Sequence, residues 1–401
     1  MNRPLPAASP LWDEVVLVVG TRRWDGRRST AERLAEGLAD HAAVLVVIPE
    51  RRGKGRDSEH PLRVVGPHLA QVVVPAGSVG AWPGLASFDA ARAGRTIRRA
   101  LVELGSPTVR AVVVTSPTAA LDAVDADVRV FAASDDLLDG WTARSRRPRV
   151  VEHELNRTQR WADVVIAGSP TLAAAIGGAG SDPVVVPDGV DDAAFAPRRP
   201  PATGAPVAGF VGDLAADVDL NALEAVADRG HELLLVGRGP RRPYPAALAQ
   251  LLRRPNVEWV GPRPRDEIPE LVARCRVGLV PLVDSPYTRA RLPLDALVHL
   301  AAGQPVVGTR CEPVRWLRAR GRGRRSWLGD GSGSLRSADV VGADEPGGFA
   351  DLVERRLAVP PGAAAVDRRR RFAWDHRWSV RAAEVAALIG VGRPDVVESA
   401  R

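Results

Sequence analysis

Short, valine-rich runs recur along this 401-residue chain, and helix-like segments separate them. Runs such as "EVVLVVG" (14–20) and "AVLVVI" (43–48) are continuously apolar, which is typical of strands buried on both faces of a parallel sheet. The intervening segment 29–41 places Leu34 and Leu38 four residues apart, on one face of a helix. This repeated alternation predicts an α/β protein with doubly wound parallel sheets.

The alternation stops once and then restarts. The segment "APRRPPATGAP" (196–206) is crowded with Pro, Arg and Gly and has no apolar periodicity, so it predicts a linker. Runs such as "VAGFVG" (207–212) and "ELLLVG" (232–237) then begin a second sheet. The predicted organisation is a first domain over 1–198, a linker over 199–206, a second domain over 207–375, and a closing helix with a tail over 376–401.

The composition favours a globular protein, since 45% of the residues are hydrophobic. No apolar run approaches the roughly 20 residues that cross a bilayer, and residues 1–10 lack the apolar core of a secretion signal. We therefore expect a cytoplasmic protein. Cys275 and Cys311 are interpreted as free thiols, and the histidines show no metal-ligand spacing, so no metal is expected.

The formal net charge is +7, and arginine supplies nearly all of the positive charge. Basic runs occur at 144–149 and 318–325 without interleaved aromatic residues, which argues against a nucleic-acid partner. Such runs would suit peripheral contact with the anionic inner face of the cell membrane. Solvated surface loops are the alternative interpretation.

Several segments follow one another in a recognisable order. The second half contains "GFVGDL", "LLLVGRG", "PNVEWVGPRPRDEIPELVARCRVGLVPL" and "LPLDALVHLAAGQPVVGT", and the first half ends with "WADVVIAGSPTLAAAI" and "VVVPDGVDDAAFAP". This succession resembles the GT-B glycosyltransferases, particularly the bacterial group 1 and teichuronic-acid-biosynthesis-like enzymes. The resemblance implies two Rossmann-like domains facing each other across a cleft, the first for the acceptor and the second for a nucleotide-sugar donor.

The same resemblance implies a transferase activity. The enzyme would move a sugar from a nucleotide-diphosphate-sugar to a saccharide or lipid-linked acceptor in polysaccharide and cell-envelope glycan synthesis. The nucleotide-sugar would be a substrate, and no cofactor is expected.

The donor's diphosphate suggests which residues would bind it. Small residues at strand-to-helix turns let backbone N–H groups approach phosphate, a helix N-terminus adds partial positive charge, and arginine can hold phosphate through two hydrogen bonds. Alternatively, the glycines only permit tight turns and the arginines are solvated surface residues. Arg291 is the preferred phosphate ligand because it directly precedes the "LPL" turn, and the resemblance places Val260 and Gly261 at the base edge. The predicted donor-binding residues are Gly212, Asp213, Arg238, Val260, Gly261, Arg263, Arg291, Pro293, Leu294, Asp295 and His299.

The sequence departs from the resembled pattern in this region. The family usually has a lysine after "PL" and a glutamate before the aromatic of "EYLA", where this chain has Asp295 and Val298, with His299 at the aromatic position. In the related pattern with two glutamates eight apart, the corresponding residues are Ala290 and Val298. A carboxylate beside a diphosphate is repulsive unless a cation bridges them. The alternatives are therefore a GT-B-fold binding or scaffold protein without transferase activity, or another α/β enzyme such as a nucleotide-sugar epimerase.

The first half offers two acidic candidates for catalysis. Asp135 and Asp136 follow the predicted strand 128–133 in "FAASDDLLDG", where a carboxylate could deprotonate the acceptor hydroxyl. Asp136 is preferred as the catalytic residue, and a helix-capping pair is the alternative. Trp24 and Asp25, in the loop "GTRRWDGRRST", are candidate acceptor-binding residues, because an aromatic ring can stack on a sugar while an acid binds its hydroxyls. Exposed loop residues without a role remain the other interpretation.

Overall fold

The chain forms two compact units. One comprises Met1–Asp188 together with Trp378–Arg401, and the other comprises Gly189–Arg377. Most of the predicted linker, 199–204, lies outside the described residues, so its extent stays a prediction. The computed structural model describes residues 12–20, 29–51, 62–76, 83–116, 124–133, 148–177, 182–195, 205–240, 242–320 and 335–392.

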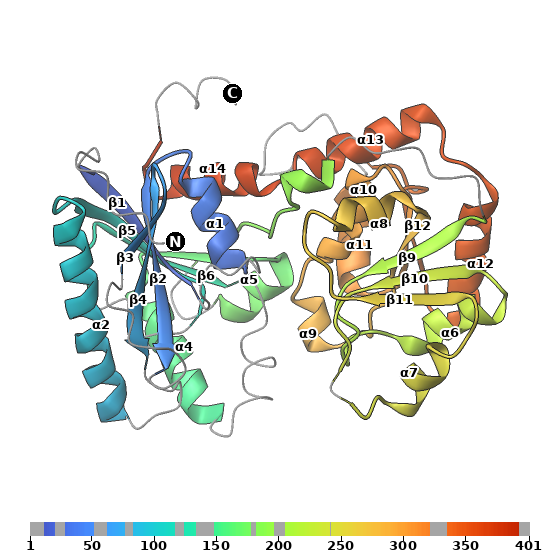
Figure 1. The fold of residues 1–401 in the computed structure, drawn as a ribbon, viewed down its shortest axis with the longest axis horizontal. Helices are drawn as coiled ribbons and strands as arrows, with labels where there is room; N and C mark the ends of the chain where they lie inside the picture. The colour runs from blue at the N-terminus through green and yellow to red at the C-terminus, as the bar shows by residue number, and fades with distance from the viewer. Residues whose placement is uncertain are drawn as a thin grey trace. The chain divides into compact units, whose positions relative to one another are not determined.

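The first unit contains, within its described residues, an eight-stranded sheet in the order β3-β4-β2-β1-β5-β6-β7-β8. The first strands of this sheet are drawn in blue in Figure 1. All neighbouring strands run parallel except β3, which pairs with β4 in the antiparallel direction. The middle of the sheet is buried, since Val15 to Val19 are at most 4% exposed. This burial explains the continuous apolar run at 14–20. The strands are β1 (Glu14–Val19), β2 (Ala43–Arg51), β3 (Leu62–Gly66), β4 (Leu69–Ala76), β5 (Thr108–Val114), β6 (Val128–Ala133), β7 (Val164–Ala167) and β8 (Val184–Val185).

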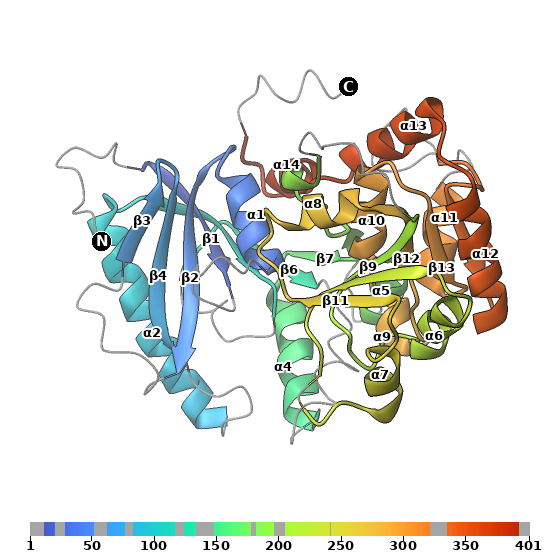
Figure 2. The same ribbon diagram turned by 45° about the vertical axis from the view of Figure 1, so that its right-hand side comes forward.

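The helices of the first unit come from both ends of the chain. Helix α1 begins with a capping box between Ser29 and Glu32. The last helix, α14, packs against α1, and the two lie side by side in Figures 1 and 2. Trp378, Ala382 and Val385 of α14 enter the same hydrophobic core as the strands of this unit. The helices are α1 (Thr30–Leu38), α2 (Pro83–Glu103), α4 (Pro148–Trp161), α5 (Pro170–Ile176) and α14 (Trp378–Leu388).

The second unit has a sheet of six described strands, all parallel, in the order β11-β10-β9-β12-β13-β14. Counted along the chain, this is the 3-2-1-4-5-6 order of the Rossmann fold. The two faces of β10 belong to different clusters: Leu233 and Leu235 to one, Leu234 and Val236 to the other, so both faces are covered. The strands are β9 (Val207–Val211), β10 (Glu232–Val236), β11 (Val257–Gly261), β12 (Cys275–Val280), β13 (Val306–Thr309) and β14 (Val340–Ala343).

Helices cover the second sheet on both sides. Helices α6 and α12 pack together over the cluster that contains Leu233 and Leu235. Helix α10 packs against α13 in a further hydrophobic cluster. The two ends of this unit pair with each other, since Val190 forms a parallel bridge with Arg377 and its N–H donates to the carbonyl oxygen of His376 at 2.8 Å. The helical segments are η2 (Asp192–Phe195), α6 (Leu220–Asp228), α7 (Ala246–Leu251), α8 (Ile268–Ala273), α9 (Pro286–Arg289), α10 (Leu294–Ala301), α11 (Glu312–Arg320), α12 (Pro346–Ala358) and α13 (Ala363–Trp374).

A buried ion cluster fixes α13 to the second sheet. Asp339 is fully buried directly before β14, and its carboxylate accepts hydrogen bonds at 2.7 Å from the Nε atoms of Arg368 and Arg369. Burial alone would raise the pKa of Asp339, but the hydrogen bonds from Arg368 and the Arg336 N–H, with the charge of Arg369, hold it below its ordinary value. Arg369 also donates to the carbonyl oxygen of Gly303 at 2.9 Å. Removing the central charge would leave two guanidinium groups without their counter-ion.

A substitution at Gly37 of α1 tests how closely α14 packs against α1. A Cβ atom at position 37 would lie 2.5 Å from the Cβ of Ala382, so Gly37→Ala should destabilise the first unit by about 1–2 kcal/mol, even though alanine is the better helix former. In the double variant with Ala382→Gly, urea unfolding should show a loss smaller than the sum of the single losses by about 1 kcal/mol or more. Strictly additive losses would contradict this contact.

Asp339→Asn should destabilise the second unit by roughly 3–5 kcal/mol, because it leaves the buried guanidinium of Arg369 and the partly buried guanidinium of Arg368 without a counter-charge. Urea unfolding at neutral pH measures this loss. Asp344→Asn is the matched control, since it breaks an exposed ion pair with Arg310, and its effect should stay within about 1 kcal/mol. Equal effects of the two substitutions would contradict the structural role of Asp339.

Candidate functional site

The strand order of the second sheet reverses between β9 and β12, and ligands of open α/β sheets bind beyond the carboxyl ends of strands at such a switch point. The loops that follow these two strands contact each other there. The N–H of Val283 donates to the carbonyl oxygen of Asp217 at 2.9 Å, and the N–H of Asp219 donates to that of Pro281 at 2.8 Å. We call this region the donor edge: residues 212–217 after β9, 237–238 after β10, and 291–295 at the start of α10.

Glycines end three neighbouring strands of this sheet. Gly237 has a φ of +146°, and a Cβ there would lie 1.8 Å from the carbonyl oxygen of Gly212. Gly261 has a φ of +71°, and its carbonyl oxygen accepts from the N–H of Gly237 at 3.0 Å. At these two positions the backbone itself requires glycine, so the tight-turn interpretation of Gly261 holds whether or not a ligand binds. Val260 precedes it at the end of β11 and is partly buried.

Asp213 and Arg238, both predicted donor-binding residues, pair with each other. The Arg238 guanidinium donates to the carboxylate from Nη2 at 2.6 Å and from Nε at 3.0 Å, and the Arg238 N–H donates to it at 3.1 Å. The hydrogen bond to Asp213 raises the pKa of Arg238. About half of each side chain is exposed, and exposed pairs are worth no more than about 1 kcal/mol. An anionic ligand can therefore compete with Asp213 for Arg238.

Arg291 lies at the centre of the donor edge. Its Nη1 donates to the Asp217 carboxylate at 2.9 Å, and its guanidinium carbon lies 5.0 Å from the centre of the Tyr287 ring. Pro293 is the N-cap residue of α10, and Leu294 is its first helical residue. The structure thus places Arg291 beside the N-terminus of α10, where the sequence had suggested an anion site.

Asp295 occupies the first turn of α10. One of its carboxylate oxygens would lie 2.9 Å from a Cβ at Gly212, so the carboxylate faces the turn that follows β9. Burial raises the pKa of Asp295 to about 7; the positive charge of Arg291 opposes this shift, and the negative charges of Asp217 and Asp213 add to it. Near neutral pH this carboxyl group is therefore protonated in a large fraction of molecules.

Two other predicted donor-binding residues make side-chain contacts outside the donor edge. His299 is fully buried, and its Nδ1 lies 2.7 Å from Oε1 of Gln304. A Cβ at Gly278 would come within 2.2 Å of the imidazole, so His299 fills a space inside the sheet-helix core, and we give it no part in the donor site. Arg263 is exposed, and its guanidinium lies 3.9 Å from the carboxylate of Glu267, one turn further along the chain.

Asp217 did not stand out in the sequence. It contacts Arg291 directly and contributes to the raised pKa of Asp295. The only signal was its position shortly after a predicted strand, in "GDLAADVD", where Asp219 has the ordinary role of capping α6. Nothing in the spacing separated the one acid from the other.

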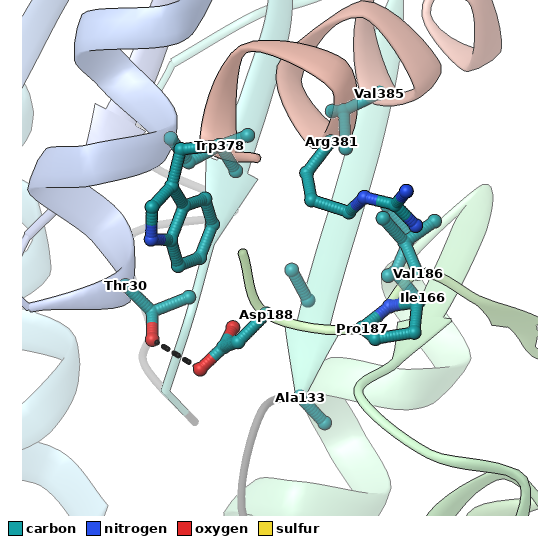
Figure 3. A pocket seen from close by; sticks show the side chains of 11 residues that line it. Thr30, Ala133, Ile166, Val186, Pro187, Asp188, Trp378, Arg381 and Val385 are labelled. Atoms are coloured by element: carbon teal, nitrogen blue, oxygen red, sulfur yellow. Dashed lines mark hydrogen bonds between the residues drawn. The ribbon is translucent and has the colours of Figure 1, made fainter. Parts of the chain in front are cut away.

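The predicted catalytic residues Asp135 and Asp136, and the predicted acceptor residues Trp24 and Asp25, lie outside the described residues. Among the residues that are described, the corresponding edge of the first unit holds a pocket between the start of α1, the ends of β6 and β7, and α14 (Figure 3). Two polar features line it. Thr30 donates to the carboxylate of Asp188 at 3.0 Å, and the buried guanidinium of Arg381 forms an ion pair with Glu384 at 3.2 Å.

Metal ligands and membrane-spanning helices are both absent from the described part of the chain. No group of three or more His, Cys, Asp and Glu side chains is arranged to hold a metal ion in the segments that the structure describes. Within the same segments, no helix is both long enough and apolar enough to cross a membrane.

Comparison with known families finds a match within the second unit. A family model described as "Glycosyl transferases group 1" matches residues 205–330. TuaH of Bacillus subtilis (strain 168), described as a teichuronic acid biosynthesis glycosyltransferase, is 35% identical over 104 residues, which are 26% of this chain and 26% of that protein. The alignment therefore spans about a quarter of this relative.

Solved structures match over nearly the whole chain. Sucrose-phosphate synthase from Thermosynechococcus elongatus has a TM-score of 0.66 at 16% identity, covering 94% of this chain and 98% of that one. HepE of Anabaena, solved in complex with UDP and glucose, has a TM-score of 0.61 at 14% identity, covering 94% and 99%. The protein therefore has the GT-B fold. Residues 205–330, within its second unit, match the group 1 glycosyltransferase model, in agreement with the resemblance predicted from the sequence motifs.

The raised pKa of Asp295 predicts that the stability of the second unit depends on pH. Its ordinary pKa is 3.8 and the folded value is about 7, so the folded state resists ionisation and loses stability as the pH rises from about 4 to about 7. Asp295→Asn should therefore stabilise the second unit by up to a few kcal/mol above about pH 7, and this gain should shrink as the pH falls toward 4. Urea unfolding of both proteins across this range measures it. A difference that is constant with pH would mean that Asp295 ionises normally.

Proposed function

We propose that this protein is a glycosyltransferase that moves a sugar from a nucleotide-diphosphate-sugar to a saccharide or lipid-linked acceptor in cell-envelope polysaccharide synthesis. The proposal rests on where the family match falls in the structure. The group 1 match, residues 205–330, contains the whole donor edge, including Gly212, Arg238, Arg291 and Asp295. A relative described as a teichuronic acid biosynthesis glycosyltransferase supports the cell-envelope context.

The donor edge has the parts that a diphosphate requires. Arg291 and Arg238 supply guanidinium groups that can hold phosphate oxygens through paired hydrogen bonds. The N-terminus of α10 adds backbone N–H groups and partial positive charge. The ends of β10 and β11, at Gly237 and Gly261, would face the nucleoside, and HepE, solved with UDP-glucose, is a GT-B neighbour that binds such a donor.

The first unit would bind the acceptor. In this proposal Asp136, with Asp135 beside it, accepts the proton of the acceptor hydroxyl as that oxygen attacks the anomeric carbon. The bond from the anomeric carbon to the diphosphate oxygen breaks, and the nucleoside diphosphate leaves with the bonding electrons. Trp24 and Asp25 would contact the acceptor sugar. The protein would work in the cytoplasm, where arginine-rich surface segments favour peripheral contact with the anionic inner face of the membrane and thus with a lipid-linked acceptor.

A binding or scaffold role is the second candidate, and one observation favours it. The carboxylate of Asp295 faces Gly212, at the place where a diphosphate would approach the backbone, and Val298 offers no hydrogen bond to a ribose. A protein that had lost its donor would tolerate both residues.

Calorimetric titration with UDP-glucose, GDP-mannose and ADP-glucose separates these two candidates. We expect saturable binding of one conjugate, and release of its nucleoside diphosphate when membranes carrying acceptor are added. Arg291→Ala should weaken this binding roughly 10- to 100-fold, because a charged hydrogen-bonded contact to phosphate is lost. Arg291→Lys keeps the charge and should lose less.

Arg254→Ala is the matched control for Arg291→Ala. Arg254 forms an ion pair with Asp228, but it precedes β11 and so lies at the amino edge of the sheet, away from the donor edge. Its substitution should leave nucleotide affinity within about twofold, since an exposed pair contributes little. Absence of binding by the folded wild-type protein to every conjugate would favour the scaffold role.

A further inference from the structure

Asp295 stands in an unusual place for an acid. It projects from the first turn of α10 toward the turn after β9, with a carboxylate oxygen 2.9 Å from the position of a Cβ on Gly212. The space in front of this glycine is taken by that carboxylate and by the Phe210 ring, whose Cζ would also lie 2.9 Å from the Cβ. A donor diphosphate at the donor edge would therefore meet a negative charge whenever Asp295 is ionised.

Three charged side chains act on the ionisation of Asp295. Arg291, which precedes α10, favours the ionised form, as does the N-terminus of the helix itself. Asp217 and Asp213, from the loop after β9, favour the neutral form. All three of these side chains are already engaged: Arg291 pairs with Asp217 at 2.9 Å, and Asp213 pairs with Arg238 at 2.6 Å.

The other titratable group of α10, His299, is buried in the core, with its Nδ1 2.7 Å from Oε1 of Gln304. Burial and the two acids prevail over Arg291, so that the pKa of Asp295 lies at about 7. A diphosphate bound beside it would add more negative charge and raise this pKa further. Protonation removes the repulsion and converts the carboxylate from an acceptor into a group that can also donate.

We propose that Asp295 binds the donor in its neutral form, donating a hydrogen bond to an oxygen of the diphosphate-sugar, so that donor binding takes up one proton. The inference rests on the proposed function and deepens it, since it names the residue that links donor affinity to pH. The proton comes from solvent, and no covalent bond of the donor changes on binding.

The experiment is calorimetric titration of the full-length protein with UDP-glucose, GDP-mannose and ADP-glucose from about pH 6 to about pH 8.5. Sugar conjugates are used because the terminal phosphate of a free nucleoside diphosphate titrates near pH 6, which would obscure the effect. For wild type, affinity should be constant below about pH 7 and fall about tenfold per pH unit above it, as expected when only the protonated form binds. Buffers of different ionisation enthalpy should report uptake of about one proton per ligand at about pH 8.

Asp295→Asn cannot ionise and keeps a donating group, so its affinity should be independent of pH and close to the low-pH affinity of wild type. Asp295→Ser is a second variant that cannot ionise, and it should also lose the pH dependence. Asp228→Asn, at the amino edge of the same sheet, is the matched control and should keep the full dependence of wild type.

The outcomes separate this inference from the proposed function. Binding by wild type that does not vary with pH overturns the inference alone, as does a pH dependence that persists unchanged in Asp295→Asn. Loss of the dependence on adding Mg²⁺ overturns it too, because a bridging cation would then be the counter-charge. Failure of both wild type and Asp295→Asn to bind any conjugate at any pH overturns the proposed function and this inference with it.

Discussion

The close backbone contact between the ends of β9 and β10 determines the geometry of the donor edge. Gly237 approaches Gly212 so nearly that a Cβ on it would meet the carbonyl oxygen of Gly212 at 1.8 Å. The same approach lets the N–H of Leu214 reach the carbonyl oxygen of Arg238 at 2.7 Å. The two loops are thus joined by main-chain hydrogen bonds before any side chain is considered. The Asp213–Arg238 pair and the position of Gly212 under Asp295 follow from that junction.

The alternation of valine-rich runs and helices was enough to predict two doubly wound sheets, because strands buried on both faces have no polar positions to conceal them. Two strands were not predicted, for opposite reasons. Strand β3 is largely exposed and pairs in the antiparallel direction at the sheet edge, so its sequence lacks a continuous apolar run. Strand β14 offers only two consecutive valines between polar and small residues, so no apolar run marks it.

The sequence predicted where the candidate donor-site residues lie on the sheet, but not which side chains they contact. Strand ends marked Gly212, Arg238 and Arg291 correctly as residues of one edge, because parallel strands bring their carboxyl ends together. The sequence could not distinguish an arginine that contacts a buried acid, such as Arg291, from an exposed one, such as Arg263, in a chain where arginine is so frequent. Burial of His299 depends on the absence of a side chain at Gly278, which lies far from it in sequence.

The net charge of the whole chain also fails to predict the charge at the donor edge. The net charge is +7, which suggests a surface ready for phosphates. At the donor edge, however, the three carboxylates of Asp213, Asp217 and Asp295 face the two guanidinium groups of Arg238 and Arg291. With every group ionised, the negative charges of this set outnumber the positive ones by one, and Asp295 is the acid whose pKa burial raises. The local charge, set by which loops the fold brings together, therefore differs in sign from the net charge of the chain.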